Sequence, residues 1–374
     1  MRILHVTDCY LPRLGGIEMH VSDLAGRQQA SGHDVVVVTR EAGDHAGPVP
    51  VERLRCGSLA LGAGASIRRL VAERRIEVVQ VHLSVVSPLA WSALRSLGNV
   101  PVVATVHSVL PAAPEVLRSF MRLTGLRHQA VVLTAVSEAA AAPWRAAVGD
   151  TTPVSVLHNG IDPSAWSTSG RRRNPSVFTL VSVGRLARRK RQIALVQVLA
   201  DVQHRLPEGI VLRAVLVGDG PQSGRVRDAV ARAGLTGHVE LPGTMTREQI
   251  RAVLAEADVY AAPATLESFG IAALEARCAG VPVVAMSQGG AGEFVEHGRE
   301  GFLVPDYAAM VDVLMVLATD PALRERIARH NATTVPTMAW PTVLAQHDAV
   351  YARAQMRAPL STRIQRLQSV EHSR

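Results

Sequence analysis

Two series of short hydrophobic segments alternate with amphipathic stretches along the chain. The segments are rich in valine, leucine and isoleucine at successive positions, which is typical of parallel strands covered on both faces. The first series predicts strands at Arg2–Thr7, Asp34–Thr39, Val78–Val81, Val102–Val106 and Leu133–Val136. The second series predicts strands at Thr179–Val183, Val211–Val217, Val239–Leu241, Val259–Ala261 and Val281–Ala285.

This alternation predicts an α/β protein of two domains. A helical pattern separates the first two strands, so the chain begins with a β-helix-β unit of a doubly wound sheet. A length of 374 residues suits two domains of ordinary size. We therefore predict a first domain over residues 1–168 and a second over 169–340, followed by a helix at about 341–358 and a disordered tail at 359–374.

The composition argues against a disulfide-rich, zinc-binding, secreted or membrane-spanning protein. Hydrophobic residues make up 48% of the chain and aromatic residues only 3%, so the cores must be built from valine, leucine, isoleucine and alanine. The cysteines Cys9, Cys56 and Cys278 are too few and too scattered for a disulfide scaffold or a zinc cluster. The amino-terminal sequence enters a strand directly, unlike a signal peptide, and no apolar run reaches the length of about 18 residues that spans a bilayer. We therefore expect a cytoplasmic protein.

The formal net charge of +8 indicates an anionic partner. Phosphate-bearing substrates, an anionic membrane surface and nucleic acid all fit this charge. The basic residues are not interleaved with aromatic ones, which argues against nucleic acid. Weak contact with anionic lipid at the inner membrane face is a further expectation, and a solvated surface is its alternative. The arginines on which the membrane hypothesis rests are Arg68, Arg69, Arg74, Arg75, Arg118, Arg122 and Arg127.

The segment from residue 264 to 285 contains the densest chemistry of the chain. Glu267 precedes an expected helix, Ser268 is a candidate cap for that helix, and Gly280 is a typical stop before a β-branched run. A strand, a loop and a helix start therefore follow one another closely, which is where open α/β sheets bind ligands.

The first turn of this helix is a candidate phosphate site. Phe269, Gly270 and Ile271 would present backbone N–H groups that lack helical acceptors, and the helix dipole there favours an anion. Glu275 lies one turn beyond Ile271 on the same face. It could therefore hold one end of a ligand while Glu267 holds the other, although two solvated surface glutamates are the alternative interpretation.

Three further strand ends carry candidate residues. Gly15 and Gly16 follow the first strand, where a tight turn alone would be the alternative explanation. His107 ends the strand that precedes it, a position where a lone histidine is as often structural as functional. Arg185 and Lys190 follow the first strand of the second series, where a planar fork and a point charge could neutralise a diphosphate. A basic surface turn is the alternative for that pair.

The glycine-rich stretch that begins at Gly218 does not predict a dinucleotide site. Asp219 would bring a negative charge against a pyrophosphate, and Ser223 replaces the third glycine of the usual motif. We interpret this stretch as part of the fold.

The spacing of these residues resembles the signature of family 4 retaining glycosyltransferases, also called glycosyl transferases group 1. The resemblance covers nearly the whole chain and implies the GT-B fold, in which two Rossmann-like doubly wound domains face each other across a cleft. It also implies that the terminal helix returns to the first domain. The motif consists of Glu267, Phe269-Gly270, Glu275, Gly280, Val281-Pro282-Val283, Gly289-Gly290 and Glu293.

The resemblance implies a role for each candidate residue. His107 would line the sugar of the donor, Glu267 would face the transferred sugar, and Glu275 would contact the ribose. Arg191 stands where many relatives have glycine, which bears on the reach of Lys190. The expected catalytic residues are His107 and Glu267. The expected donor-binding residues are Gly15, Gly16, Arg185, Lys190, Phe269, Gly270, Ile271 and Glu275, with Gly243, Thr244 and Met245 in a loop near the nucleobase.

We therefore expect a glycosyltransferase that moves a sugar from a UDP-, GDP- or ADP-sugar to a hydroxyl acceptor with retention of configuration. The acceptor would be a sugar, a lipid-linked molecule or a small molecule. The sequence contains no Asp-x-Asp motif, so neither a metal nor another cofactor is expected. The alternatives are a nucleotide-sugar hydrolase or epimerase and a basic binding protein without catalysis.

Overall fold

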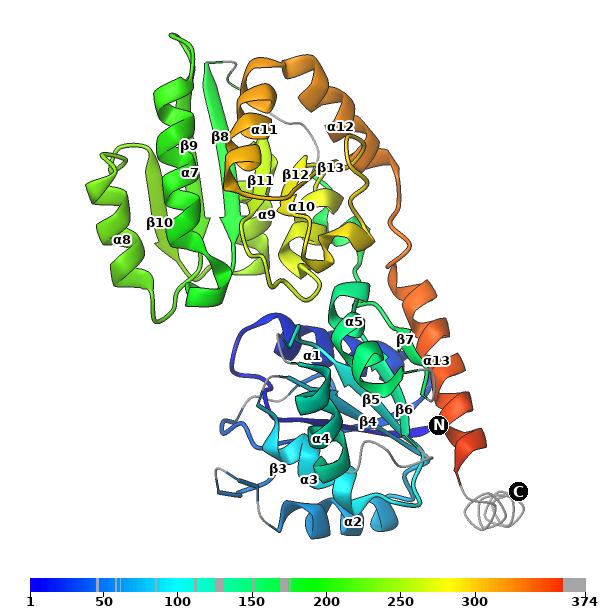
Figure 1. Cartoon of the computed structure of the whole chain (residues 1–374). Helices are drawn as coiled ribbons and strands as arrows, with labels where there is room; N and C mark the ends of the chain where they lie inside the picture. The colour runs from blue at the N-terminus through cyan, green and yellow to red at the C-terminus, as the bar shows by residue number, and fades with distance from the viewer. Residues whose placement is uncertain are drawn as a thin grey trace. The chain divides into compact units, whose positions relative to one another are not determined.

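The computed structural model describes residues 1–358 except 45–46, 58, 61, 85, 111–112, 125–130, 150–151, 169–173 and 175. The chain forms two compact units (Figure 1). Unit 1 comprises Met1–Gly160 together with the chain from Trp340 onward, and unit 2 comprises Ile161–Ala339. The expected tail at 359–374, Arg127 and residues 169–173 at the expected domain boundary lie outside the described residues.

Unit 1 contains a seven-stranded parallel sheet in the order β3-β2-β1-β4-β5-β6-β7. The order reverses direction between β1 and β4, which is the kind of switch point where open sheets bind ligands. The strands are β1 Arg2–Thr7, β2 Asp34–Thr39, β3 Val51–Arg53, β4 Val78–Leu83, β5 Val102–Val106, β6 Val131–Ala135 and β7 Val154–Val156. The helices are α1 Gly16–Ala30, α2 Ala63–Glu73, α3 Pro88–Ser96, α4 Pro114–Thr124, α5 Glu138–Val148 and α13 Trp340–Arg357.

Unit 2 contains a six-stranded parallel sheet in the order β10-β9-β8-β11-β12-β13. Figure 1 shows the helices packed around each sheet. The strands are β8 Val177–Val183, β9 Val211–Val217, β10 Val239–Gly243, β11 Val259–Ala262, β12 Val283–Met286 and β13 Gly301–Val304. The helices are α6 Pro163–Trp166, α7 Gln192–Arg205, α8 Ser223–Arg232, α9 Arg247–Glu256, α10 Ile271–Cys278, α11 Tyr307–Thr319 and α12 Pro321–Thr333.

Each sheet is buried in its own aliphatic core, which confirms the prediction of two parallel-sheet α/β domains. In unit 2, Leu195 and Leu199 of α7 and Leu314 of α11 are fully buried in the main cluster. In unit 1, α1 contributes Val21 and α13 contributes Tyr351 to the corresponding cluster. The aliphatic residues therefore do the packing that the low aromatic content demands.

The sequence pattern missed β3, β7 and β13, because each has only three or four residues, too few for periodicity to be recognised. It also placed the start of β12 two residues early. The N–H of Val281 donates to the carbonyl of Ala276 and so completes the end of α10, while Pro282 has no N–H to offer. The strand therefore begins at Val283.

The chain re-enters unit 1 at Trp340. Next to this point, the N–H of Ile161 donates to the carbonyl of Met338 at 2.9 Å, so the two chain passages run side by side. Within unit 1, a Cβ on Gly160 would lie 2.3 Å from the ring of Trp340. Helix α13 then packs against β4, β5 and β6. No helix in the described part of the chain is both long and apolar enough to cross a membrane.

Candidate active site

In unit 2, the loops that follow β8 and β9 are held together by backbone hydrogen bonds. The N–H of Leu186 donates to the carbonyl of Asp219, and the N–H of Gly218 donates to that of Gly243. A Cβ on Gly218 would lie 2.1 Å from the carbonyl oxygen of Gly184, so only glycine allows this approach. The Asp219 carboxylate accepts from Ser223 and from the N–H of Gly220. The Gly218 stretch thus supports the loop of Arg185.

Arg185 and Lys190 lie on this supported loop. Arg185 is exposed, and Lys190 ends a short 3-10 helix of Arg188–Lys190. Arg191, at a position where the family resemblance implies that glycine is common, adopts a left-handed backbone with φ of 55°. Glycine adopts that conformation without strain, whereas arginine pays a penalty on the order of 1 kcal/mol. The turn therefore keeps a shape suited to glycine although arginine occupies it.

Lys190 forms an ion pair with Glu267 across the carboxyl edge of the sheet. Nζ of Lys190 lies 2.5 Å from Oε2 of Glu267, and the two side chains are 26% and 19% exposed. Below them, the hydroxyl of Tyr260 donates to the carbonyl of Val183 at 3.1 Å. Burial, and secondly the nearby charges of Glu267 and Glu275, raise the pKa of Tyr260, so this phenol stays protonated and holds the end of β8.

Helix α10 begins differently from the prediction. Its N-cap is Gly270, which has a left-handed backbone with φ of 91°, and no side chain caps it. The prediction that Ser268 caps the helix is therefore wrong, because the helix starts two residues too late for that side chain. Phe269 is 1% exposed and packs against Phe294, so only its backbone can meet a ligand. Ile271 begins the first turn, whose N–H groups point toward the same edge of the sheet.

Two glycines after β12 pack closely against the backbone of Glu267 and Ser268. The N–H of Gly290 donates to the carbonyl of Glu267 at 2.9 Å. A Cβ on Gly290 would lie 2.3 Å from the carbonyl oxygen of Ser268, and one on Gly289 would lie 3.2 Å from Cβ of Glu267. The double glycine is therefore required for the loop to reach the backbone that carries the carboxylate.

The expected nucleobase loop follows β10. Gly243 has a positive φ of 79° and accepts the bond from Gly218, whereas Thr244 is exposed and Met245 is half-buried. In unit 2, Lys190 therefore contacts Glu267, and α10 begins next to the same carboxylate. Arg185 and residues 243–245 follow β8 and β10 at the carboxyl edge of the same sheet.

In unit 1, Gly15 is the N-cap of α1 and Gly16 is its first residue. Glu18 folds back over this start, because a Cβ on Gly15 would lie 2.5 Å from its Oε2. Its Oε1 pairs with Nε of Arg13 at 3.0 Å, and its side chain is only 7% exposed. The sequence interpretation missed Glu18, although an acid in the first turn after a glycine pair is a recognisable signal.

His107 lies at the carboxyl end of β5 in the same unit. It is 4% exposed, and its backbone N–H donates to the carbonyl of Leu83. Its Nε2 lies 2.9 Å from Nδ1 of His82. Burial, with a smaller contribution from His347, lowers the pKa of His107 to about 3, so the ring is neutral at neutral pH. It can accept or donate a hydrogen bond but does not supply a positive charge.

Comparison with known proteins decides the family. A profile described as "Glycosyl transferases group 1" matches residues 170–333, and one described as "Glycosyltransferase Family 4" matches residues 14–165. The chain belongs to glycosyltransferase family 4. Among relatives of this glycosyltransferase is a Mycobacterium tuberculosis enzyme named GDP-mannose-dependent alpha-(1-6)-phosphatidylinositol monomannoside mannosyltransferase. It is 32% identical over 337 residues, which cover 81% of this chain and 85% of the relative.

A second relative of the glycosyltransferase is named D-inositol 3-phosphate glycosyltransferase and comes from Pseudarthrobacter chlorophenolicus. It is 30% identical over 369 residues, which cover 87% of each chain. Two solved structures share the GT-B fold. Anabaena HepE, in complex with UDP, has a TM-score of 0.72 and 22% identity over the whole of both chains. Sucrose-phosphate synthase from Thermosynechococcus elongatus has a TM-score of 0.77 and 20% identity, covering 94% of this chain and 99% of its own.

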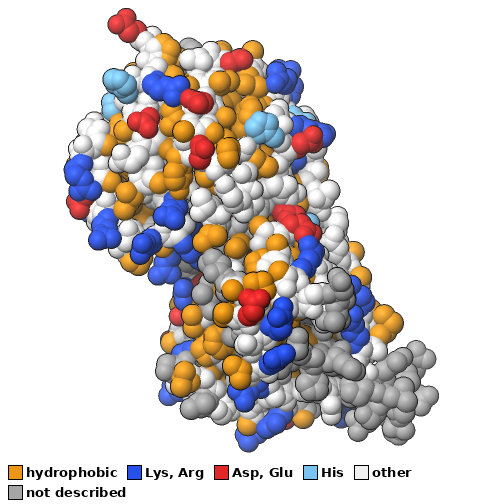
Figure 2. Space-filling view, viewed as in Figure 1, with side chains coloured by type: hydrophobic (Ala, Val, Ile, Leu, Met, Phe, Trp, Pro, Cys, Tyr) orange, Lys and Arg blue, Asp and Glu red, His pale blue; other side chains and the backbone are white. Residues whose placement is uncertain are grey.

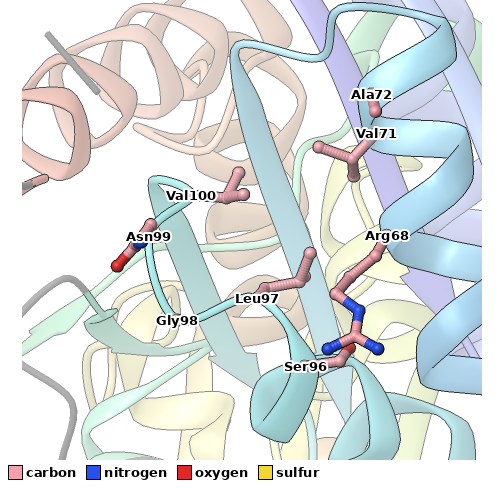
Figure 3. Close-up of a pocket in the computed structure, with 8 residues that line it drawn as sticks. All are labelled: Arg68, Val71, Ala72, Ser96, Leu97, Gly98, Asn99 and Val100. Atoms are coloured by element: carbon pink, nitrogen blue, oxygen red, sulfur yellow. The ribbon is translucent and has the colours of Figure 1, made fainter. Parts of the chain in front are cut away.

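Two cavities in unit 1 of the glycosyltransferase lie at opposite edges of its sheet. A cavity of about 350 Å³ lies between α2 and the loop that leads into β5, at the amino edge of the sheet and thus opposite His107. Figure 3 shows the Arg68 side chain extending across it toward Ser96. A second cavity, of about 130 Å³, lies at the carboxyl end of β4. It is lined by Leu83, Ser84, Trp91, Leu110, Val116, Leu117 and Trp144.

On the face shown in Figure 2, the Lys and Arg side chains of the glycosyltransferase are dispersed among hydrophobic ones. Some of the arginines expected to meet lipid are engaged within the fold. Nε of Arg118 donates to the carbonyl of Ala147, and Arg74 lies 3.4 Å from Glu52. Within the described residues, no three His, Cys, Asp or Glu side chains are arranged to hold a metal ion.

Proposed function

We propose that this glycosyltransferase uses a nucleoside diphosphate sugar as its donor. The observation that carries the proposal is the Lys190–Glu267 ion pair beside the first turn of α10. An ammonium and a helix start stabilise a departing diphosphate, while the carboxylate faces the sugar that the diphosphate leaves. Arg185 is on the same loop as Lys190 and adds a second positive charge. The names of relatives add support, because one depends on GDP-mannose and one structure contains UDP.

The transfer would retain the anomeric configuration and require no metal and no further cofactor. Retention follows from the family resemblance, and it means that the acceptor oxygen bonds to the face from which the diphosphate leaves. Lys190, Arg185 and the α10 dipole supply positive charge where the leaving group develops negative charge. Glu275, one turn into α10, would hold the ribose, and residues 243–245 would lie near the base. Gly15 and Gly16, at the start of α1, would also contact the donor.

The acceptor that we propose is a hydroxyl of an inositol-type or sugar-type polyol, free or lipid-linked. Two relatives are named for phosphatidylinositol or inositol phosphate acceptors. The cavity of about 130 Å³ at the carboxyl end of β4 is lined by two tryptophans, and aromatic faces pack well against the apolar faces of ring polyols. His107 is neutral and would accept a hydrogen bond from a hydroxyl of the donor sugar.

We also propose that the enzyme is cytoplasmic and makes weak contact with an anionic membrane through α4. Leu117 and Met121 of this helix are buried, whereas Val116 and Leu123 are 61% and 73% exposed beside the exposed Arg122. An apolar and basic helix face of this kind binds anionic lipid surfaces.

The deciding experiment combines a donor screen with product analysis. UDP-, GDP- and ADP-sugars are tested first by thermal shift, because a donor that binds only the folded state raises the melting temperature. The stabilising donor is then incubated with myo-inositol, inositol 1-phosphate or phosphatidylinositol, and NMR reports the anomer formed. Sugar release at the same rate with and without acceptor would indicate a hydrolase. Donor binding without product would indicate a binding protein. EDTA should leave the rate unchanged if no metal is required.

A further inference from the structure

A continuous run of buried hydrogen bonds crosses the interior of unit 1 and ends on His107. His82 of β4 and His5 of β1 stand on neighbouring strands of the sheet. Nε2 of His107 lies 2.9 Å from Nδ1 of His82, and Nε2 of His82 lies 2.9 Å from Nδ1 of His5. Nε2 of His5 lies 2.7 Å from Oε1 of Gln28. These four side chains are at most 4% exposed, so their polar atoms depend on one another.

The run continues beyond Gln28 through two further side chains. The amide Nε2 of Gln28 donates to the hydroxyl of Tyr351 at 2.8 Å. That hydroxyl donates in turn to Oε1 of Gln80. Tyr351 is on α13, so the helix that returns to unit 1 supplies the group that connects Gln28 to Gln80. Burial raises the pKa of Tyr351, which keeps its proton available for donation.

The far end of the run sets its direction. Nε2 of Gln80 donates to Oγ1 of Thr105, which lies 2.8 Å from Oγ1 of Thr134. Thr134 donates to the carbonyl of Ala104. A carbonyl oxygen can only accept, so Thr134 is the donor there and each preceding group must donate toward it. Followed back along the run, this order requires Nε2 of His107 to donate to Nδ1 of His82.

The three rings of the run can keep this order only if they are uncharged. Burial lowers the pKa of His5 to about 4 and, together with the neighbouring histidines, holds the pKa of His82 well below its usual range. His107 is likewise neutral. Each ring therefore carries one proton, donates through one nitrogen and accepts through the other.

We propose that His82 is a positioning residue that holds His107 in the tautomer with a proton on Nε2, which leaves Nδ1 of His107 as a hydrogen-bond acceptor. The tautomer itself follows from the network alone. Its use rests on the proposed function, in which Nδ1 of His107 accepts a hydrogen bond from a sugar hydroxyl. The opposite tautomer would present an N–H and lose that interaction.

NMR of the wild-type protein tests the tautomer directly. In a two-bond ¹H–¹⁵N correlation of histidine-labelled protein at neutral pH, Nε2 of His107 should have the shift of a protonated nitrogen and Nδ1 that of an unprotonated one. A ¹⁵N–¹⁵N coupling across the hydrogen bond should join Nε2 of His107 to Nδ1 of His82. A protonated Nδ1 on His107 would overturn the proposal, as would a charged ring.

Two variants of His82 of nearly equal size provide the matched comparison. In His82→Asn, Oδ1 takes the place of Nδ1 and can still accept from His107, whereas His82→Leu offers no acceptor. The Asn variant should keep the wild-type tautomer, and the Leu variant should lose it. If the Leu variant does not fold, the wild-type coupling and the Asn variant still decide. An unchanged tautomer in the Leu variant would refute the role of His82.

Steady-state kinetics of the His82 variants tests whether the tautomer of His107 affects sugar transfer. The Leu variant should lower kcat/KM about tenfold, the scale of one lost hydrogen bond, while the Asn variant stays within about twofold. Equal losses in both variants, with the tautomer kept in the Asn variant, would show a purely structural role and overturn the proposal. If the wild-type protein shows the expected tautomer but transfers no sugar, the proposed function fails and the assignment of the tautomer stands.

Discussion

Lys190 and Glu267 are 77 positions apart in the sequence, yet Nζ of one lies 2.5 Å from Oε2 of the other. The motif pattern gives these residues different partners, a diphosphate and a sugar. In the proposed function, their ion pair would bring both partners to one point, where the donor would break between its sugar and its phosphate. Before the donor arrives, the ion pair holds both side chains in place. A bound diphosphate would then compete with Glu267 for the ammonium of Lys190.

Replacing Lys190 should weaken both donor binding and the departure of the diphosphate. We expect Lys190→Ala to lower kcat/KM for the donor on the order of a hundredfold, because one cation at the developing charge is lost. Steady-state kinetics and the donor-induced thermal shift measure the two effects. Arg189→Ala is the matched control, since Arg189 is an exposed cation in the same turn. Equal, small losses in both variants would show that the turn is only a basic surface.

Replacing Gly290 should displace Glu267 through the backbone, because the N–H of Gly290 donates to the carbonyl of Glu267. In Gly290→Ala, the new Cβ meets the backbone carbonyl of Ser268 at 2.3 Å, so the loop must move, at a loss of about 1–3 kcal/mol of stability. Activity should fall further than stability explains. Gly292→Ala is the control, because its nearest neighbour is Leu303 at 3.7 Å. Thermal melts and kcat measured together separate the effects, and wild-type kcat in Gly290→Ala would contradict the assigned support.

Patterns within one segment could be predicted from sequence, and contacts between segments could not. The strands β1, β2, β5 and β9 have the predicted bounds because short, mainly hydrophobic runs define them. The spacing from Glu267 to Glu275 was recognisable because the whole unit is local. The pairing of His5, His82 and His107 depends on the order of β1, β4 and β5, which hydrophobicity does not encode. Histidine inside an otherwise apolar strand was nevertheless a visible signal.

The buried histidines should make unit 1 sensitive to mild acid. The pKa values of His5, His107 and His347 fall to about 4, 3 and 4, below the ordinary value of about 6.5. The unfolded chain therefore binds more protons below pH 6.5, and stability is lost as pH falls toward 4. Each histidine should contribute a slope of about 1 kcal/mol per pH unit.

Urea unfolding between pH 7.5 and 5 measures this slope. His347→Asn should reduce it, because Nδ2 of Asn can still donate to the carbonyl that Nδ1 of His347 now contacts, but Asn does not titrate. A free energy of unfolding that is constant from pH 7 to 5 would contradict the burial of neutral histidines.

Contact of α4 with lipid predicts weak flotation with liposomes. The protein should float with vesicles that contain anionic lipid, less so as salt is raised, and not with neutral vesicles. Arg122→Glu should reduce flotation because it reverses an exposed charge on this helix. Arg251→Glu, an exposed arginine on α9 of unit 2, is the charge-matched control. Equal flotation with neutral and anionic vesicles would remove the proposal.

The two glutamates should differ in the kinetic constant that they govern. Glu275 lies in α10 and would hold the ribose equally in the ground state and the transition state. Glu275→Ala should therefore raise the donor KM and change kcat little. Glu267 precedes the helix, touches Lys190 and would face the sugar, where positive charge develops as the diphosphate departs. Glu267→Ala should therefore lower kcat on the order of a hundredfold.

Glu267→Gln refines this test, because it keeps the size of the side chain and one acceptor oxygen but removes the charge. A loss of kcat in Glu267→Gln close to that in Glu267→Ala would show that the negative charge matters, whereas near wild-type kcat would assign Glu267 to holding sugar hydroxyls. Thermal melts of all three variants check folding, since loss of the ion pair also leaves Lys190 without this partner. If Glu267→Ala keeps wild-type kcat while Glu275→Ala loses it, the two roles are reversed.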